Sequence, residues 1–220
     1  MTIAPETRSD AQEDLSSAMR AGSAAEHERA EGSAFMSALL DGRMSAAGYV
    51  AYLQRLRSVY AALESTAQAL TDDPIAGAVI DPVLDRLSAL DADLAFWAPD
   101  GAAPVDSPAA RSYADRIVGE SAAFSGAFVA HHYTRYLGDL SGGQAIGRIL
   151  DRTFDLDGAG IAFYAFDIDK VKPYKDRYRQ RLDEVGARLT ATQRTRVVDE
   201  VRRAFDCNQA LFAELSDLYC

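Results

Sequence analysis

Three closely spaced glycines, Gly138, Gly142 and Gly143, interrupt an otherwise helix-compatible segment, HHYTRYLGDLSGGQAIGRIL, which runs from residue 131 to residue 150. A glycine within a helix costs about 1 kcal/mol relative to alanine, so Gly138, Gly142 and Gly143 together cost about 3 kcal/mol of local stability. Gly138 and Gly142 are four residues apart and therefore share one helical face. Without side chains on that face, a flat ligand can lie against the backbone and the helix can bend around it. The segment predicts a wall for a planar ligand.

Polar side chains accompany these glycines, since Arg135 and Asp139 fall in the same turns. Two simpler interpretations compete with a ligand wall: Gly-x-x-x-Gly spacing also permits close packing of helices, and a Gly-Gly pair can mark a loop. The peptide LSGGQ at residues 140–144 also matches the signature of ABC-transporter ATPases. That third interpretation is excluded, because the chain has no Gly-Lys dipeptide and hence no phosphate-binding loop.

His27 is the histidine with the clearest chemical context. Glu31 follows it by one helical turn, and its carboxylate could accept the second imidazole N–H, as partners of metal-ligating histidines do. An ordinary surface histidine with an i,i+4 carboxylate is the alternative. The other two histidines, His131 and His132, directly precede the glycine segment and could be exposed.

The spacing of the histidines tests several kinds of metal site. The sequence HERAE at residues 27–31 lacks the second histidine of a zinc-protease helix. No Glu-x-x-His occurs, which excludes a ferritin-like di-iron site of that type, and no Cys-x-x-Cys-His occurs, which excludes covalently attached c-type haem. The remaining possibility is a metal that needs a single protein ligand because a macrocycle supplies the others, namely haem with an axial histidine.

Composition narrows the class of protein. The chain has 220 residues, 48% of them hydrophobic, and a formal net charge of −10, which argues against non-specific nucleic-acid binding. No apolar run approaches the roughly 20 residues needed to span a bilayer, and the first residues are polar and acidic, unlike a signal peptide. The two cysteines, Cys207 and Cys220, form no Cys-x-x-Cys motif. We therefore expect no membrane partner and a reduced, cytoplasmic setting.

Helical periodicity dominates the chain. The clearest helix should begin after Ser45 and bury an apolar face that extends to Leu63. Pro108 and Pro173 are placed to begin further helices, and a final long helix is expected over residues 190–218. Residues 155–169 look irregular, and residues 161–166 could form a short strand without a partner. We predict an all-α domain over residues 10–220, preceded by a flexible N-terminus over residues 1–9.

The sequence resembles the haem oxygenases of the soluble bacterial kind. The resemblance spans most of the chain, and the glycine-containing motif behind the histidine motif makes it specific. The matching segments are HERAE at 27–31 with FM at 35–36, YAALE at 60–64, DLAFW at 93–97, YTRYLGDLSGGQ at 133–144, YKxxYR at 174–179 and FxxN at 205–208. The fold implied by this resemblance is a single helical domain that holds haem between a proximal helix and a kinked distal helix.

The resemblance also assigns roles to individual residues. His27 would be the proximal iron ligand, with Glu31 near its free ring nitrogen. Asp139 would hold a water network, joined by Tyr60 and Arg135, that delivers protons to bound dioxygen. The remaining site residues would contact the haem: Gly138, Gly142 and Gly143 on the distal face, Phe205 beside the ring, and Arg20, Tyr133, Lys175 and Arg179 at the propionates.

The implied activity is oxidative cleavage of haem b, as both substrate and cofactor, to biliverdin, carbon monoxide and ferrous iron, with α regiochemistry. Electrons would come from a ferredoxin or a flavoprotein reductase, because no flavin or nucleotide motif is present. A non-catalytic haem carrier or sensor on the same fold is the main alternative, and Asp139 argues against it because a carrier needs no proton relay. A relative of the thiamin-degrading helical proteins is a second alternative, but those depend on a nucleophilic cysteine.

A basic segment near the C-terminus contains all three lysines of the chain. Six cations fall within twelve residues, namely Lys170, Lys172, Lys175, Arg177, Arg179 and Arg181. Lys175 and Arg179 are four residues apart and share a helix face, from which they could reach two propionates. Arg177 and Arg181 should point elsewhere and could contact an acidic electron donor.

Overall fold

The computed structural model describes residues 13–220 and contains only helical elements and loops over that range. The expected flexible segment 1–9 and the start of the expected domain at residue 10 lie outside the described residues. The helices are α1 (Leu15–Gly22), α2 (Ala24–Glu31), α3 (Ala34–Leu40), α4 (Ala46–Ala69), α5 (Leu87–Trp97), α6 (Pro108–Ala123), α7 (Ser125–His132), α8 (Gln144–Phe154), α9 (Val171–Gly186) and α10 (Ala191–Tyr219), with short turns η1 (Ala76–Ala78), η2 (Pro82–Leu84), η3 (Tyr133–Leu137), η4 (Asp139–Gly143) and η5 (Ala162–Tyr164) between them.

Side-chain caps start the helices where the sequence predicts them. Ser45 accepts a hydrogen bond from the Gly48 amide at the start of α4, and Ser107 caps α6 one residue before Pro108. Thr190 and Gln193 form a complete capping box at the start of α10. Such caps satisfy backbone N–H groups that have no partner inside the helix. The predicted helix over residues 190–218 is therefore confirmed to within one residue.

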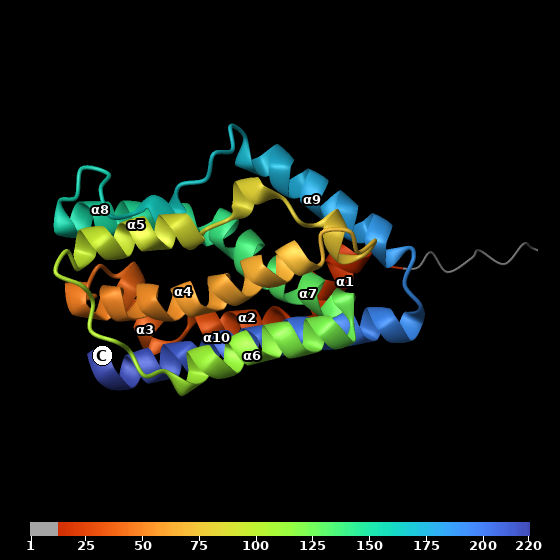
Figure 1. Cartoon of the computed structure of the whole chain (residues 1–220), viewed down its shortest axis with the longest axis horizontal. Coiled ribbons are helices and arrows are strands. Elements are labelled where there is room, and N and C mark those ends of the chain that lie inside the picture. The colour runs from red at the N-terminus through yellow and green to blue at the C-terminus, as the bar shows by residue number, and fades with distance from the viewer. Residues whose placement is uncertain (1–12) are drawn as a thin grey trace, which may run out of the picture.

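Helix α4 runs through the middle of the molecule, and α10 runs along its lower side behind α6 (Figure 1). The predicted apolar face of α4 is buried. Helix α6 packs on α4, while α2, α3 and α7 pack on α10. Helices α1 and α9 pack together at one end of the molecule, and α3 and α8 lie together at the other (Figure 1). The ligand site described below extends between these two ends.

Two predictions about local structure are wrong. Residues 161–166 contain the turn η5 instead of a strand, because the buried Asp93 carboxylate accepts the Ala162 and Phe163 amides at 2.8 Å each. His131 and His132 are buried, with 0% and 3% of their surface exposed. His131 lies 2.9 Å from Glu200, and His132 Nδ1 lies 2.8 Å from the Tyr178 hydroxyl, so both imidazoles belong to the core.

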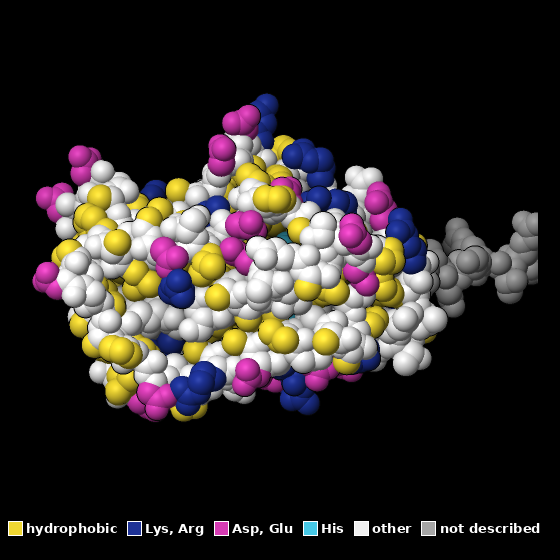
Figure 2. All heavy atoms as spheres, in the orientation of Figure 1, with side chains coloured by type: hydrophobic (Ala, Val, Ile, Leu, Met, Phe, Trp, Pro, Cys, Tyr) yellow, Lys and Arg dark blue, Asp and Glu magenta, His cyan; other side chains and the backbone are white. Residues whose placement is uncertain are grey.

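Charged side chains are unevenly distributed over the surface. Lys and Arg side chains gather over α9, while Asp and Glu side chains are scattered over much of the visible face (Figure 2). Among residues 13–220, no helix is both long enough and apolar enough to cross a membrane.

Candidate functional site

The glycine-rich segment forms one wall of a cavity. Between α7 and α8 the chain stays helical, but η3 and η4 are π-helical turns, in which hydrogen bonds join residues five apart. A Cβ atom added to Gly138 or Gly142 would meet no other atom within 4 Å. Both glycines line the cavity, so their missing side chains leave its wall flat. The helix therefore departs from regular α-helical geometry at the glycines and exposes its backbone to the cavity there.

The cavity measures 650 Å³ and lies between α2 and the η3–η4 wall. Ligand pockets of drug-sized molecules typically measure roughly 300–1,000 Å³. Eleven of the thirteen predicted site residues line this cavity: Arg20, His27, Glu31, Tyr133, Arg135, Gly138, Asp139, Gly142, Gly143, Arg179 and Phe205. Tyr60 lies behind the wall, and Lys175 stands beside it, where its Nζ donates to the Ser141 hydroxyl at 3.1 Å.

His27 faces the cavity from α2, opposite the glycines. About half of its side chain is exposed, and the Glu31 carboxylate lies 3.5 Å from its Nδ1, which leaves Nε2 for a ligand. The Phe205 ring contacts the imidazole edge-on, with 5.4 Å between ring centroids. This arrangement suits a metal-ligating imidazole that is oriented by a carboxylate and an aromatic ring.

The position of α2 follows from a close approach of two helices. A Cβ atom on Gly22 would lie 2.4 Å from Val198 of α10, so only glycine fits where α1 ends and α2 begins. Arg202 of α10 donates to the Gly22 carbonyl at 2.6 Å, and Gln209 donates to the Glu26 carbonyl at 3.2 Å. Helix α10 therefore fixes the backbone that carries His27.

Arg135, Asp139 and Tyr60 form a buried hydrogen-bonded network on the distal side. The Tyr60 hydroxyl donates to one carboxylate oxygen of Asp139, and Arg135 Nη2 lies 3.4 Å from the other. Arg135 also donates to the side-chain oxygen of Asn208 at 2.8 Å and to the Tyr60 hydroxyl at 3.3 Å. Asn208 belongs to the FxxN segment at 205–208, but the sequence did not predict that its side chain would position Arg135.

Burial controls the proton affinities in this network. It raises the pKa of the Asp139 carboxyl, and the positive charge of Arg135 opposes that rise. Burial also raises the pKa of Tyr60 well above its ordinary value, so its hydroxyl remains protonated. A carboxylate held between a phenol and a guanidinium can take up and return a proton at the cavity wall.

Cationic side chains gather at the end of the cavity formed by α1 and α9. Arg20 and Arg179 line it, and both act on the phenol of Tyr133: burial raises the pKa of Tyr133, while the two arginines lower it. Arg179 also pairs with Asp176 at 2.9 Å. This end of the cavity suits an anionic group such as a carboxylate.

Arg177 and Arg181 are both absent from the cavity lining, in line with the prediction that they point elsewhere, but they differ in burial. The Arg181 guanidinium lies 5.7 Å from the centre of the Tyr178 ring, and its Nε is buried. Arg177 is exposed, as predicted, and lies over the Tyr174 ring at 5.9 Å. Arg181 follows Tyr178 by three residues and Tyr174 by seven, which brings it toward the face of α9 on which both tyrosines are buried.

The opposite end of the cavity contains residues that were not predicted to belong to the site. They are Met36, Tyr52, Ile146, Tyr164 and Phe212, contributed by α3, α4, α8, η5 and α10. A Cβ atom on Gly143 would lie 3.1 Å from the Tyr164 ring, so Gly143 makes room for this tyrosine as well as lining the cavity. The apolar spacing of these residues is equally typical of core positions, which is why only the fold identifies them.

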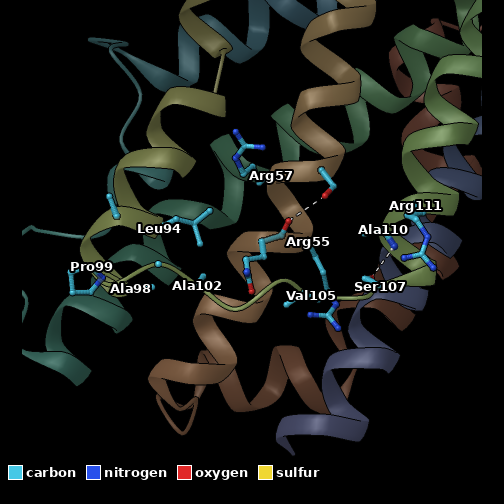
Figure 3. Close-up of a pocket in the computed structure, with 14 residues that line it drawn as sticks. Arg55, Arg57, Leu94, Ala98, Pro99, Ala102, Val105, Ser107, Ala110 and Arg111 are labelled. Carbon is cyan, nitrogen blue, oxygen red and sulfur yellow. Dashed lines mark hydrogen bonds between the residues drawn. The ribbon is translucent and has the colours of Figure 1, made fainter.

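A second cavity of 640 Å³ lies beneath the loop between α5 and α6 (Figure 3). Its three arginines already have partners, because Arg55 pairs with Glu214, Arg57 with Asp91 and Arg111 with Asp106. Neither a histidine nor the glycine wall contributes to its lining. The chemistry predicted from the sequence therefore resides in the first cavity.

The residues of the first cavity fit haem. The open space at Gly138 and Gly142 admits a flat ring, His27 offers a nitrogen from the facing helix, and Arg20 and Arg179 offer cations to two propionates. Within residues 13–220, no three His, Cys, Asp or Glu side chains converge on a common point. A helical fold with one histidine opposite a flat glycine wall defines a protein built to hold a macrocycle between two helices.

Comparison with known proteins gives the family. The family model described as heme oxygenase matches residues 13–214. Heme oxygenase 1 from Synechocystis is 35% identical over 207 residues, which cover 91% of this chain and 84% of that protein. Human heme oxygenase 1 is 35% identical over 212 residues, which cover 94% of this chain and 73% of that protein. The chain belongs to the heme oxygenase family.

Solved structures agree with this assignment. Heme oxygenase-1 from Synechocystis, in complex with heme, matches with a TM-score of 0.84 and 36% identity over 92% of each chain. Heme oxygenase from Leptospira interrogans matches with a TM-score of 0.86 and 31% identity, covering 92% of this chain and all of that one. The predicted all-α haem oxygenase fold is confirmed.

Proposed function

We propose that this protein cleaves haem oxidatively to biliverdin, carbon monoxide and ferrous iron, using dioxygen and electrons from a separate donor. The observation that carries the proposal is the buried network of Asp139, Arg135 and Tyr60 on the cavity wall beside two glycines. A protein that only carried or sensed haem would gain nothing from a carboxylate buried at a cost in desolvation. The network therefore favours the enzyme over the non-catalytic alternative.

Haem, when bound, would supply both the iron that activates dioxygen and the ring that is oxidised. His27 would ligate the iron through Nε2, and Glu31 would hold the imidazole through Nδ1. Gly138 and Gly142 would let the ring lie against the helix backbone, where a side chain would otherwise stand. Arg20, Tyr133, Lys175 and Arg179 would bind the propionates and so fix the rotation of the ring within the cavity.

The protein's own contribution to the chemistry is controlled proton delivery. Asp139 carries a carboxylate at the wall, Tyr60 hydrogen-bonds one of its oxygens, and Arg135 limits how far its pKa rises. No histidine lines the distal wall, since His131 and His132 face the core. A carboxylate acting through water is a weaker and more distant acid than an imidazole in direct contact would be. That difference suits a reaction in which the ring, and not another substrate, must be oxidised.

The electron donor is proposed to be a ferredoxin or a flavoprotein reductase that docks near α9. Lys and Arg side chains gather there on an otherwise acidic protein (Figure 2). An acidic partner would be steered to this surface by long-range attraction.

Addition of haem to the purified protein, followed by a reductant under oxygen, tests the function directly. The expected result is a histidine-ligated haem spectrum that is replaced by the spectrum of biliverdin as carbon monoxide is released. If the haem complex remains stable and forms no biliverdin, the result favours the alternative function of a haem carrier or sensor.

A further inference from the structure

Helices α7 and α9 bring together two buried polar side chains that have no role in the proposed reaction. The hydroxyl of Tyr178 on α9 lies 2.8 Å from Nδ1 of His132 on α7, and the two rings are nearly parallel, with 8° between their planes. Tyr178 is 0% exposed and His132 is 3% exposed. Neither side chain lines the cavity. A phenol and an imidazole joined in this way can exchange a proton out of contact with solvent.

The Tyr178 hydroxyl is the donor in this hydrogen bond. Burial raises the pKa of Tyr178 well above its ordinary value, so the phenol keeps its proton. Burial, and then the positive charge of Arg181, lowers the pKa of His132 to about 3, so the imidazole is neutral and one of its ring nitrogens accepts. A phenol O–H is more acidic than the N–H of a neutral imidazole. The phenol therefore donates, and Nδ1 accepts.

An electron leaves a phenol most easily when the phenolic proton can leave with it. The oxidised phenol is a strong acid, and without a base beside it the protein interior would have to hold a bare positive charge, which is costly. Nδ1 of His132 is such a base for Tyr178. Tyr113 lacks one, because its buried hydroxyl has no hydrogen-bond partner among residues 13–220. Tyr178 is therefore suited to reversible one-electron oxidation, and Tyr113 is not.

Aromatic rings connect this pair to the cavity wall. The Tyr136 ring lies 4.3 Å from the His132 ring and 5.5 Å from the Tyr60 ring, measured between centroids, and His132 lies 5.8 Å from Tyr178. The Tyr60 hydroxyl donates to Asp139, which lines the cavity. All four rings are buried, and an electron can cross between neighbouring aromatic rings at such separations. The series Tyr60, Tyr136, His132, Tyr178 therefore leads from the cavity wall to α9.

The far end of this series lies on the helix where the electron donor is proposed to dock. Tyr178 is buried on the inner face of α9, and the Arg181 guanidinium lies 5.7 Å from the centre of its ring. Lys and Arg side chains gather on the outer face of the same helix (Figure 2). An acidic donor attracted to that surface would stand close enough to Tyr178 to return an electron to it.

We propose that Tyr178 is a redox-active tyrosine that protects the protein when a peroxide reaches bound haem in the absence of reductant. Hydrogen peroxide takes up two electrons as its O–O bond breaks, and one oxygen leaves as water while the other stays with the haem. The iron supplies one electron. Tyr178 supplies the second through the ring series, and its proton passes to Nδ1 of His132. An electron from the donor then restores the phenol, and His132 returns the proton.

The proposal rests on haem binding, as in the proposed function, but not on bilin formation. Freeze-quench EPR of the ferric haem complex, mixed with one equivalent of hydrogen peroxide and no reductant, tests it. Wild type should yield a tyrosyl radical with a hydrogen-bonded proton that exchanges in D2O. Tyr178→Phe keeps the ring and its packing and should lose this radical. Tyr113→Phe is the matched control, because Tyr113 is equally buried but has no base beside its hydroxyl, and it should retain the radical.

Several outcomes would overturn the assignment. They are a radical that survives in Tyr178→Phe, a wild-type radical without an exchangeable hydrogen bond, and the absence of any tyrosyl radical in wild type. Under excess peroxide, Tyr178→Phe should lose its haem absorbance faster than wild type, and an equal rate would overturn the protective role. With reductant and dioxygen, Tyr178→Phe should form biliverdin as wild type does. Failure of wild type to form biliverdin would overturn the proposed function alone, so the two failures are distinguishable.

Discussion

The two walls of the cavity are supported in different ways. On the α2 side, the His27 imidazole is half exposed and has Glu31 and the edge of Phe205 beside it. On the distal side, Arg135 and Asp139 are buried, and every polar group in their network bonds another. The first wall keeps a coordination position free for the ligand, and the second keeps its geometry whether or not a ligand is present. Substitutions on the two walls should therefore separate ligand binding from stability and from chemistry.

The largest effect is expected at His27. His27→Ala should fold normally, because half of the side chain is exposed, but should lose the histidine-ligated haem spectrum and recover it with added imidazole. His132→Ala is the contrasting variant: it should retain the spectrum and lose roughly 2 kcal/mol of stability, because it leaves a cavity and an unpaired Tyr178 hydroxyl. Absorbance spectra and urea unfolding measure the two properties. If His27→Ala retains the histidine-ligated haem spectrum without added imidazole, the assignment of His27 as the iron ligand is refuted.

Asp139→Ala should lower the rate of bilin formation by ~100-fold or more while haem affinity stays nearly unchanged, because only the proton relay is lost. Asp139→Asn keeps a hydrogen-bond acceptor for Arg135 and Tyr60 but cannot carry the proton. Compared with Asp139→Ala, Asp139→Asn should therefore be more stable to unfolding but equally inactive. Single-turnover kinetics followed at the bilin absorbance, together with haem titration, test this. Wild-type turnover in either variant would contradict the relay.

Glu200 supports the distal helix from behind and should control acid stability. It bonds Arg116 at 2.6 and 2.7 Å and lies 2.9 Å from His131. Burial alone would raise its pKa, but these partners lower the pKa of Glu200 to about 2. Because the folded pKa lies below the unfolded value, the stabilisation of about 3 kcal/mol is complete above pH 4.5 and is lost as the pH falls toward 2.

Glu200→Gln should therefore be less stable than wild type at pH 6, and the difference should shrink below pH 4.5. Urea unfolding at several pH values gives the free energies. A difference that does not depend on pH would show that packing, and not charge, explains the contribution of Glu200. Haem binding should be retained in this variant, since Glu200 does not line the cavity.

The smallest effects are expected on α9, where two arginines lie two residues apart. Arg179→Glu should loosen the propionates and change which meso carbon is attacked, because Arg179 lines the cavity. Arg177→Glu should keep the α isomer and slow reduction by the electron donor a few-fold, most clearly at low salt where screening is weak. Product isomer analysis and stopped-flow reduction at two ionic strengths measure these effects. An unchanged isomer pattern in Arg179→Glu would argue against the propionate contact, and salt-independent reduction would argue against docking at Arg177.

The sequence was sufficient to predict the helical fold, because helical periodicity is a local pattern, and the resemblance to haem oxygenases supplied eleven of the residues that line the cavity. Helical periodicity defined α4 and α10, and the glycine spacing identified the flat wall. The prediction failed where a polar residue is stabilised by a partner far away in the chain. His131 is paired with Glu200, 69 residues later, and Asp93 organises the turn at Ala162 across a similar separation. Neither partner is visible in a pattern of neighbouring residues.

The end of the cavity opposite the cationic side chains illustrates a second limit of prediction from sequence. Tyr52 and Tyr164 belong to apolar stretches that are equally typical of any helical core, and they come from two elements that meet only in the folded protein. A tyrosine in such a stretch is ordinarily satisfied by some nearby carbonyl or side chain. Only the structure shows that both tyrosines line the cavity.

The π-helical turns η3 and η4 also determine where this protein can change in length as it evolves. Removing one residue from a continuous helix rotates everything beyond it by about 100°. A π-helical turn contains one residue more than an α-helical turn, so a one-residue deletion within η3 or η4 can be absorbed by a return to α-helical hydrogen bonds. The same deletion in the regular helix α7 would instead turn Ile146, Gly147 and Leu150 of α8 out of the core, in which all three are buried. Relatives that retain this cavity should therefore vary in length more readily within residues 133–143 than in the regular helices on either side.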